Sequence, residues 1–281
     1  MTFRFALRSL AASALVSFAC YVPAHAAEPL KTIESGKLTY GVAATFAPFE
    51  FTRAGALTGF DIDLVTAVAK QMNLAPDAQN MQFNGLIPAL QGGRLDIINS
   101  AMYITPARSA QVDFVPYMRI GDRIIVQAAN PTKITGRDDT LCGKNVAVTL
   151  GGIEETYARA DAQRCTAGGK SSPNIMTLPT AQDTVLSLRQ GRADAIYDST
   201  PGTVELMSDV PNTYQAVGPE FEQTNTIGFA VPKGNAAMAA ALKAALGKVV
   251  ADGTYGKLIQ KWNLPPSVSI FDASKTASTT N

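Results

Sequence analysis

The residues with the clearest chemistry are an arginine and an aspartate, each placed just beyond a predicted buried strand. Arg108 follows Thr105-Pro106, which is typical of a helix N-cap and first helical residue, so it lies in a first turn beside free backbone N–H groups. A guanidinium there is suited to binding a carboxylate. Asp198 follows the apolar run 193–197, and its carboxylate is suited to binding an ammonium group. The pair predicts a site for a small ligand that carries both charges.

The elements that position these two residues belong to a repeated unit. LQGGRLDII at 90–98 matches LRQGRADAI at 188–196, with a helix end, a glycine turn and a buried strand in each copy. We interpret the shared aspartates, Asp96 and Asp194, as turn and cap residues. One copy leads to the cation and the other to the anion, which predicts two lobes that face each other across the ligand.

The hydrophobic periodicity predicts an α/β protein with mostly parallel sheets. Asp61 is the expected N-cap of a helix that ends near Met72. Residues 113–117 are expected to form a turn, and residues 119–129 a strand that crosses into the second lobe. The other expected strands are 37–43, 78–83, 95–98, 144–150, 175–178, 193–197 and 223–231, and the other helices are 86–91, 154–161, 181–190, 235–252 and one that begins at 254.

The first 26 residues have the pattern of a secretory signal peptide: Arg4 and Arg8, an apolar middle, and the small-residue sequence Ala24-His25-Ala26. A transmembrane anchor would need a longer, uninterrupted apolar run. Cys20 would suit a lipoprotein, but the three residues before it match such a site poorly. We therefore expect a protein exported to the periplasm, with a small, polar and disordered tail over 272–281.

Composition argues against several classes of function. Cleavage after residue 26 would change the formal net charge from +1 to −1, and so even a balance argues against nucleic acid or an anionic membrane as partner. Cleavage would also remove His25, the only histidine, which excludes a histidine-dependent triad or a histidine metal site in the exported chain. No metal or other cofactor is expected.

Two cysteines, Cys142 and Cys165, remain after cleavage, and the exported chain would fold in an oxidising compartment. We predict a disulfide between them, worth about 3 kcal/mol in the chain-entropy model. Two buried free thiols are the alternative. A zinc site is poorly supported, because the two cysteines lack further ligands nearby.

Six groups of residues, in one order along the chain, resemble the motifs of a known family. They are Ala47-Pro48-Phe49-Glu50-Phe51, Gly59-Phe60-Asp61-Ile62-Asp63-Leu64, Leu86-Ile87-Pro88-Ala89-Leu90, Ile104-Thr105-Pro106-Ala107-Arg108, Val112-Asp113-Phe114 with Pro116-Tyr117, and Asp252-Gly253-Thr254-Tyr255 before Lys261-Trp262. With them the chain resembles the polar amino-acid-binding family of periplasmic solute-binding proteins, the receptor components of ABC importers. The similarity covers residues 35–265.

The resemblance implies the type II periplasmic binding protein fold. Two α/β lobes, each a mostly parallel sheet flanked by helices, would be joined by two crossover strands and would close on a ligand between them. Lobe 1 would comprise residues 27–125 and 227–271, and lobe 2 residues 126–226.

The resemblance also implies roles for single residues. Arg108 matches the family's carboxylate clamp, and Asp198 matches the partner of the ligand's amino group. Phe46 and Phe83 fall where the family places aromatic walls against the ligand side chain. Gly151 falls in the loop where the second lobe offers backbone N–H groups.

Departures from the family pattern bear on the ligand. Members often have small or hydroxyl residues at the positions of Ala101 and Tyr103, and members that bind lysine or arginine have an acidic residue where Ala43 stands here. A cationic side chain is therefore disfavoured. With Phe46, Phe83 and Tyr103 around the cleft, we expect an apolar or aromatic amino acid, or a cyclic or methylated ammonium zwitterion held by cation–π contact.

The leading interpretation is a receptor without catalytic activity, a monomer that delivers its ligand to membrane-embedded permease subunits. The alternative is a cyclohexadienyl dehydratase acting on prephenate or arogenate, an activity that occurs on this fold and needs a general acid over the substrate. We interpret Glu154 and Glu155 as structural acids of a first helical turn. No carboxylate besides Asp198 is then expected in the cleft, which favours binding. A sensory receptor domain is disfavoured because no spanning segment follows the binding module.

Overall fold

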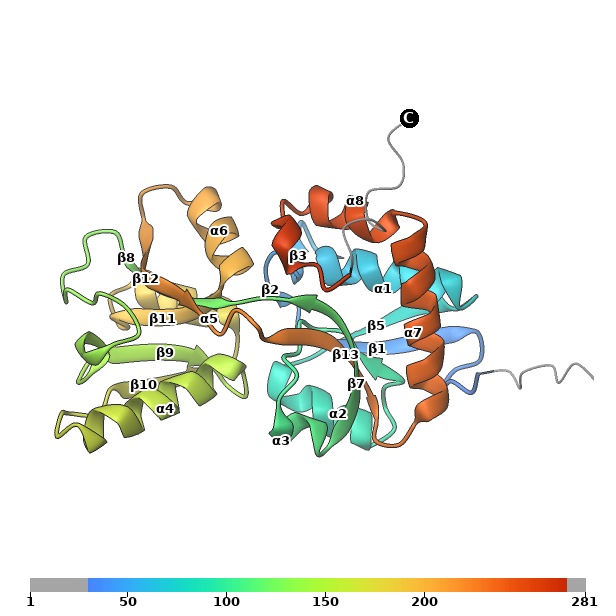
Figure 1. Cartoon of the computed structure of the whole chain (residues 1–281), viewed down its shortest axis with the longest axis horizontal. Coiled ribbons are helices and arrows are strands. Elements are labelled where there is room, and N and C mark those ends of the chain that lie inside the picture. The colour runs from blue at the N-terminus through green and yellow to red at the C-terminus, as the bar shows by residue number, and fades with distance from the viewer. Residues whose placement is uncertain (1–29, 272–281) are drawn as a thin grey trace, which may run out of the picture.

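Lobe 1 is built on a sheet of five strands: β1 (Lys37–Val42), β5 (Ala75–Asn80), β6 (Ile97–Ile98), β7 (Val112–Arg119) and β13 (Thr226–Pro232). Their order is β5-β1-β6-β13-β7; β1 is parallel to β5 and β6, and β13 is antiparallel to β6 and β7 (Figure 1). This computed structural model describes residues 30–271, so the predicted signal peptide (1–26) and tail (272–281) lie outside the described residues.

Lobe 2 repeats this plan with a second sheet. Its strands are β8 (Asp122–Gln127), β9 (Asn145–Thr149), β10 (Asn174–Leu178), β11 (Ala195–Ser199) and β12 (Tyr214–Phe221). Their order is β10-β9-β11-β8-β12, with β9 parallel to β10 and β11, and β8 antiparallel to β11 and β12. A small third sheet consists of β2 (Thr45–Phe46), β3 (Glu50–Arg53) and β4 (Ala56–Thr58).

Helices cover the sheets, as expected for two α/β lobes (Figure 1). Those of lobe 1 are α1 (Phe60–Gln71), α2 (Leu86–Gln91), α3 (Pro106–Ser109), α7 (Ala236–Ala251) and α8 (Thr254–Lys261), with short 3-10 helices η1 (Phe83–Gly85) and η3 (Pro266–Val268). Those of lobe 2 are α4 (Ile153–Ala167), α5 (Ala181–Arg189) and α6 (Thr200–Asp209), with the 3-10 helix η2 (Asp139–Leu141). Among residues 30–271, no helix has the length and apolar character needed to cross a membrane.

Two segments join the lobes, one from β7 to β8 and one from β12 to β13 (Figure 1). The lobe boundary drawn at residue 125 falls inside β8, which belongs to the second sheet from Asp122 onward. The return boundary at 226 coincides with the start of β13. The chain therefore enters lobe 2 a few residues earlier than the sequence suggested.

The repeated unit has the predicted structure in both lobes. The Asp96 carboxylate accepts a hydrogen bond from the backbone N–H of Thr39 at the neighbouring strand, and Asp194 does the same for Asn145. These two aspartates are structural, as predicted. Each aspartate holds the start of its strand against a parallel neighbouring strand, β1 in lobe 1 and β9 in lobe 2.

Two local predictions were wrong, and two elements were missed. Asp61 does not cap α1, whose N-cap is Gly59; its carboxylate instead accepts hydrogen bonds from the Ala101 N–H (2.7 Å) and the Tyr117 hydroxyl (2.6 Å). Residues 113–117 form part of β7 and not a turn. Helix α6 and strand β12 were not predicted at all.

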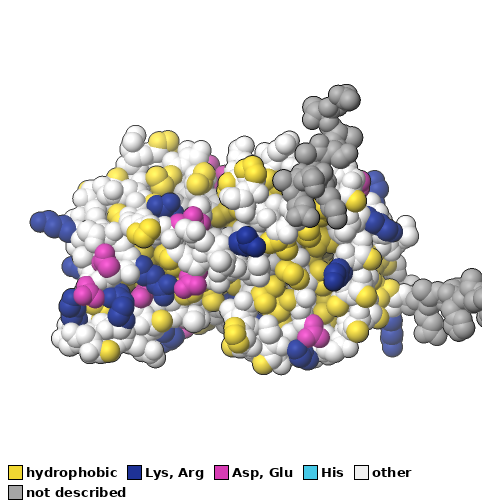
Figure 2. All heavy atoms as spheres, viewed as in Figure 1, with side chains coloured by type: hydrophobic (Ala, Val, Ile, Leu, Met, Phe, Trp, Pro, Cys, Tyr) yellow, Lys and Arg dark blue, Asp and Glu magenta, His cyan; other side chains and the backbone are white. Residues whose placement is uncertain are grey.

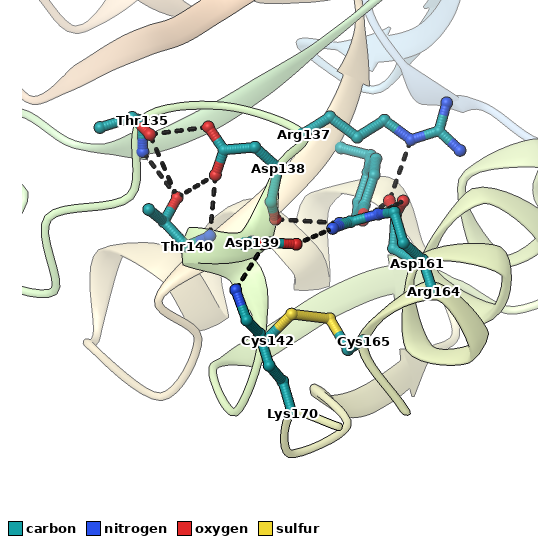
Figure 3. Close-up of polar contacts among 11 residues, drawn as sticks. Thr135, Arg137, Asp138, Asp139, Thr140, Cys142, Asp161, Arg164, Cys165 and Lys170 are labelled. Carbon is teal, nitrogen blue, oxygen red and sulfur yellow. Dashed lines mark hydrogen bonds and ion pairs between the residues drawn. A yellow bond between two sulfur atoms is a disulfide. The ribbon is translucent and has the colours of Figure 1, made fainter. Parts of the chain in front are cut away.

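The predicted disulfide between Cys142 and Cys165 is present, with Cα atoms 5.6 Å apart. It joins the end of η2 to α4 within lobe 2. Figure 3 shows it beside a polar cluster in which Asp139 pairs with Arg164 and Lys170. Because the bond lies within one lobe, it stabilises lobe 2 without restricting the movement of one lobe against the other.

Candidate functional site

A cavity of about 410 Å³ lies between the two lobes. Five of the seven predicted ligand-binding residues line it: Phe46, Phe83, Ala101, Tyr103 and Asp198. The other two, Arg108 and Gly151, lie at the contact between the lobes. In the space-filling view, charged side chains are more frequent on the lobe drawn at left, which is lobe 2, whereas hydrophobic side chains cover much of the visible face of lobe 1 (Figure 2).

Arg108 lies in the first turn of α3, as predicted. Thr105 caps this helix by accepting a hydrogen bond from the Arg108 N–H, and Pro106 is its first residue. The guanidinium donates to the carbonyl of Tyr103 (2.8 Å) in lobe 1 and to that of Gly151 (2.9 Å) in lobe 2. Burial lowers the pKa of Arg108, although the charge of Glu154 opposes the shift. Arg108 thus bridges the two lobes at the edge of the cavity.

Gly151 permits the lobes to approach closely. Its φ is +77°, a conformation that favours glycine, and a Cβ at this position would lie 3.1 Å from the Cβ of Asn84 in lobe 1. Its N–H donates to the Glu155 carboxylate (2.8 Å), and its carbonyl accepts from Arg108. Glu155 therefore occupies the N–H of Gly151 itself, and the expectation that this loop offers backbone N–H groups to a ligand stays a prediction.

The three aromatic residues predicted around the cleft, Phe46, Phe83 and Tyr103, line the cavity. Phe46 packs on Phe49 with ring centroids 5.4 Å apart, and the Arg108 guanidinium lies 5.3 Å from the centre of the Phe83 ring. Tyr103 is buried, and its hydroxyl donates to Asp122 (2.9 Å) in lobe 2. Tyr103 therefore links the lobes and also forms part of the cavity wall.

Ala101 has a positive φ of 38° and donates its N–H to Asp61, so its backbone is fixed from below the cavity. Its neighbour Ser100 keeps the hydroxyl that position 101 lacks, and that hydroxyl donates to Glu50 (2.9 Å). Both Ser100 and Glu50 line the cavity. The hydroxyl group next to position 101 in the chain is therefore already hydrogen-bonded to a buried carboxyl group.

The expectation that Asp198 is the only carboxylate in the cleft was wrong. The cavity is also lined by Glu50, Glu154, Glu205 and Asp209. Glu205 and Asp209 come from α6, the helix that the sequence analysis missed. Arg53 of lobe 1 approaches Glu205 to 3.7 Å and makes a further contact between the lobes.

Of the lobe 2 acids that line the cavity, Glu154 is buried and Asp198 is half-buried. Glu154 is only 9% exposed, and burial raises the pKa of its carboxyl group, although Arg108 opposes the shift. Burial, followed by the charge of Glu154, also raises the pKa of Asp198 well above its ordinary value. Neither carboxylate forms an ion pair with any residue in the range 30–271. Such groups are stable as anions only when a positive charge joins them.

Glu154 is a cavity residue that the sequence analysis interpreted as a structural acid. It follows Gly151-Gly152 as the second residue of α4, and the first turn of this helix meets the cavity, since Gly152, Ile153 and Glu154 all line it. Glu155, one position further, turns outward and pairs with Arg159.

Among residues 30–271, no three His, Cys, Asp or Glu side chains are grouped to hold a metal ion.

The chain is similar to bacterial proteins that bind amino acids. An arginine-binding protein of an ABC transporter in Escherichia coli (strain K12) is 32% identical over 80% of this chain and 90% of its own length. An L-cystine-binding protein of the same strain is 30% identical over 83% of this chain and 84% of its own length.

Solved structures that resemble this chain also belong to amino-acid-binding proteins. An ancestral arginine-binding protein bound to arginine has a TM-score of 0.75 and 34% identity, covering 81% of this chain and 98% of its own. An ancestral amino acid-binding protein, described as a precursor of cyclohexadienyl dehydratase, has a TM-score of 0.71 and 33% identity, covering 81% and 95%. The family model for the bacterial extracellular solute-binding proteins, family 3, matches residues 38–265. The chain belongs to this family.

Proposed function

We propose that this protein is the substrate-binding component of an ABC importer for amino acids, and that it holds an amino acid or amino-acid-like zwitterion between its lobes. The family and the amino-acid-binding functions of the relatives support this. The observation that carries it is Asp198, a carboxylate that lines the interlobe cavity without a cationic partner among the described residues. An ammonium group of a ligand would supply the missing charge.

Arg108 is the proposed partner of the ligand's carboxylate. Two of its five N–H donors bond to backbone carbonyls, so three remain without a hydrogen bond to any residue of the described range. The two carbonyl bonds fix the plane of the guanidinium at the junction of the lobes. A carboxylate that enters from the cavity can therefore meet an oriented cation with donors to spare.

The walls of the cavity support a ligand with an apolar or aromatic body, or one with a methylated or cyclic ammonium group. Phe46, Phe83 and Tyr103 present rings to the cavity, and rings attract such cations. The absence of an acid at Ala43 was the reason to disfavour lysine and arginine. The acids of lobe 2 weaken that reason, because they place negative charge on the opposite wall.

The same proposal includes the protein's surroundings. A bacterial extracellular solute-binding protein with the signal pattern of residues 1–26 would work in the periplasm. It would act as a monomer and release its ligand to the permease subunits of an importer. Because closure brings Arg108 to Gly151 and Arg53 to Glu205, the permease would meet a rigid pair of lobes when ligand is bound.

Replacement of Asp198 tests the proposal. Thermal-shift screening of the wild type against the common amino acids, betaines and ectoine-like solutes should find a ligand that raises Tm. Asp198→Asn should then weaken the binding of that ligand by about 2–5 kcal/mol, the usual cost of removing one partner of a buried charge pair. Asp183→Asn, which removes an aspartate of the same lobe outside the cavity, should leave the affinity for that ligand almost unchanged. Calorimetry that finds equal affinity in the Asp198→Asn protein would refute the proposal.

A second candidate function is favoured by one observation. Glu154 is a buried carboxyl group with a raised pKa that faces the cavity, which is what a general acid requires. One structural relative is described as a precursor of cyclohexadienyl dehydratase. Incubation of the protein with prephenate or arogenate tests for this activity, with Glu154→Gln as the matched inactive variant. Turnover by the wild type alone would establish the enzyme, and its absence would remove this candidate.

A further inference from the structure

Glu154 occupies a position that is unusual for an acid with only a structural role. Its side chain is more than nine-tenths buried and lines the cavity, yet it forms no ion pair and no hydrogen bond to another residue between 30 and 271. It lies in the first turn of the fifteen-residue helix α4, whose N-terminal partial charge favours an anion. Helix α4 thus holds this carboxylate at the cavity wall, where the charge of Arg108 acts on it without forming an ion pair.

Two glycines make room for the acids of lobe 2. A Cβ at Gly152 would lie 2.3 Å from Glu154 Oε2, and a Cβ at Gly202 would lie 2.5 Å from Asp198 Oδ1. Both distances are shorter than any contact that real side chains tolerate, so each carboxylate depends on a glycine for its position. Both glycines also line the cavity. The two carboxylates are therefore built into the wall by the same local device.

The charges around the cavity do not balance without a ligand that brings more than one cation. Arg53 is the sole basic residue among the described residues that line the cavity, and it lies against Glu205. Arg108 is bound to two carbonyls, and its remaining donors are assigned to the ligand's carboxylate. The α-ammonium group of a ligand at Asp198 would leave Glu154 uncompensated. Asp122, buried nearby, has Oδ2 without a hydrogen-bond partner among the described residues, and burial, followed by the charge of Glu154, raises its pKa well above the ordinary value.

We propose that Glu154 is a second cation subsite, and that the ligand is an amino acid whose side chain is positively charged at neutral pH. This inference rests on the proposed function, because it assumes an amino acid with its ammonium group at Asp198. It reverses the expectation drawn from Ala43: the negative charge for a basic side chain comes from lobe 2 and not from lobe 1. The aromatic rings of Phe46 and Phe83 then hold the apolar stem of that side chain.

Matched pairs of ligands test the proposal without depending on any variant. Lysine and norleucine differ only in the terminal ammonium group, and arginine and citrulline have nearly the same shape with and without the charge. The wild type should bind at least one cationic member about tenfold to a hundredfold more tightly than its neutral partner, the range expected for a hydrogen bond to a charged group. Calorimetry at neutral pH measures all four.

The variant Glu154→Gln locates the effect. It should remove the preference for the cationic member while leaving the affinity for the neutral member unchanged or higher. Glu155→Gln is the control, because it removes the same charge one residue away from a side chain that does not line the cavity, and the preference should persist. Circular dichroism and Tm confirm that both variants fold.

Each outcome has a separate meaning. A wild type that binds norleucine or citrulline as well as the charged partner overturns the cationic ligand class, and the binding function stands. A wild-type preference that survives in Glu154→Gln overturns the role of Glu154. A wild type that binds no amino acid of the wider screen removes the proposed function itself, together with this inference.

Discussion

Arg108 offers the sharpest test of how the two lobes hold a ligand, because one guanidinium would serve two purposes. It joins the Tyr103 carbonyl of lobe 1 to the Gly151 carbonyl of lobe 2, and it is the proposed partner of the ligand's carboxylate. Arg108→Ala removes both interactions at once. A pair of ligands separates them: an amino acid that the protein binds, and the amine formed by its decarboxylation, which lacks the carboxylate but keeps every other group.

The size of each effect follows from the contacts. The bond from Arg108 to Gly151 involves a charged donor at a half-exposed contact, so its loss should cost about 1.5 kcal/mol, the low end for such bonds, or roughly tenfold in affinity. This cost falls on both ligands, since both require closed lobes. Loss of the carboxylate pair should add about 2–5 kcal/mol for the amino acid alone. The amino acid should therefore lose at least about thirtyfold more affinity than the amine.

Calorimetry on the wild type and on Arg108→Ala, with each ligand, gives the four affinities. Arg108→Lys is the control: it keeps the charge and loses the planar fork, so it should restore part of the amino acid's affinity. Equal losses for the two ligands in Arg108→Ala would refute the clamp. Arg108 would then serve only to hold the lobes together.

Two further predictions concern stability. Replacement of both Cys142 and Cys165 by serine opens a loop with a sequence separation of 23. It should lower the free energy of unfolding by about 3 kcal/mol, measured by urea denaturation with circular dichroism. An unchanged midpoint of urea denaturation would contradict this prediction. The second concerns Glu50 and Asp61: burial, followed by the charge of Asp61, raises the pKa of Glu50 well above its ordinary value. Burial also raises the pKa of Asp61 to about 6, although hydrogen bonds from Tyr117 and Ala101 oppose the shift. Both values are higher in the folded than in the unfolded chain, so this contribution to stability is fully present below about pH 4 and is lost as the pH rises through 6. Tm should therefore fall less between pH 4.5 and 7.5 in Glu50→Gln than in the wild type, and parallel curves for the two proteins would show that this pair is not the cause.

Local chemistry made much of the fold predictable from sequence. The cap at Thr105, the proline after it and the glycine turns that precede Asp96 and Asp194 specify their own structure through contacts within a few residues. The disulfide followed from the compartment and from the number of cysteines.

The errors arose where distant contacts decide. Pro116 and Asp113 have the composition of a turn, but β7 is an edge strand, where a proline leaves no bond of the sheet unmade. Its partner β13 lies more than a hundred residues further along the chain, so no local pattern could show that the pairing exists. Asp61 likewise had the look of a cap, and only the approach of Ala101 and Tyr117 reveals its use.

Glu154 was misjudged for a related reason. It and Glu155 are neighbours of the same type in the same first turn, and the rule that acids stabilise helix N-termini explains both equally well. What separates them is the face of α4 on which each lies, and that depends on where lobe 1 meets the helix. Gly152 held the missing information, since a glycine beside an acid leaves the space into which that acid can turn.

The division of charge between the lobes also bears on closure. The cavity acids with raised pKa values on lobe 2 are costly to bury as anions when the lobes close without a ligand, because they leave water and gain no cation. A ligand that brings positive charge removes this cost only in the closed form, since only there do both lobes surround it. The difference in affinity between closed and open forms is what shifts a population toward closure. The same carboxylates that select the ligand would therefore also restrain the empty protein from closing.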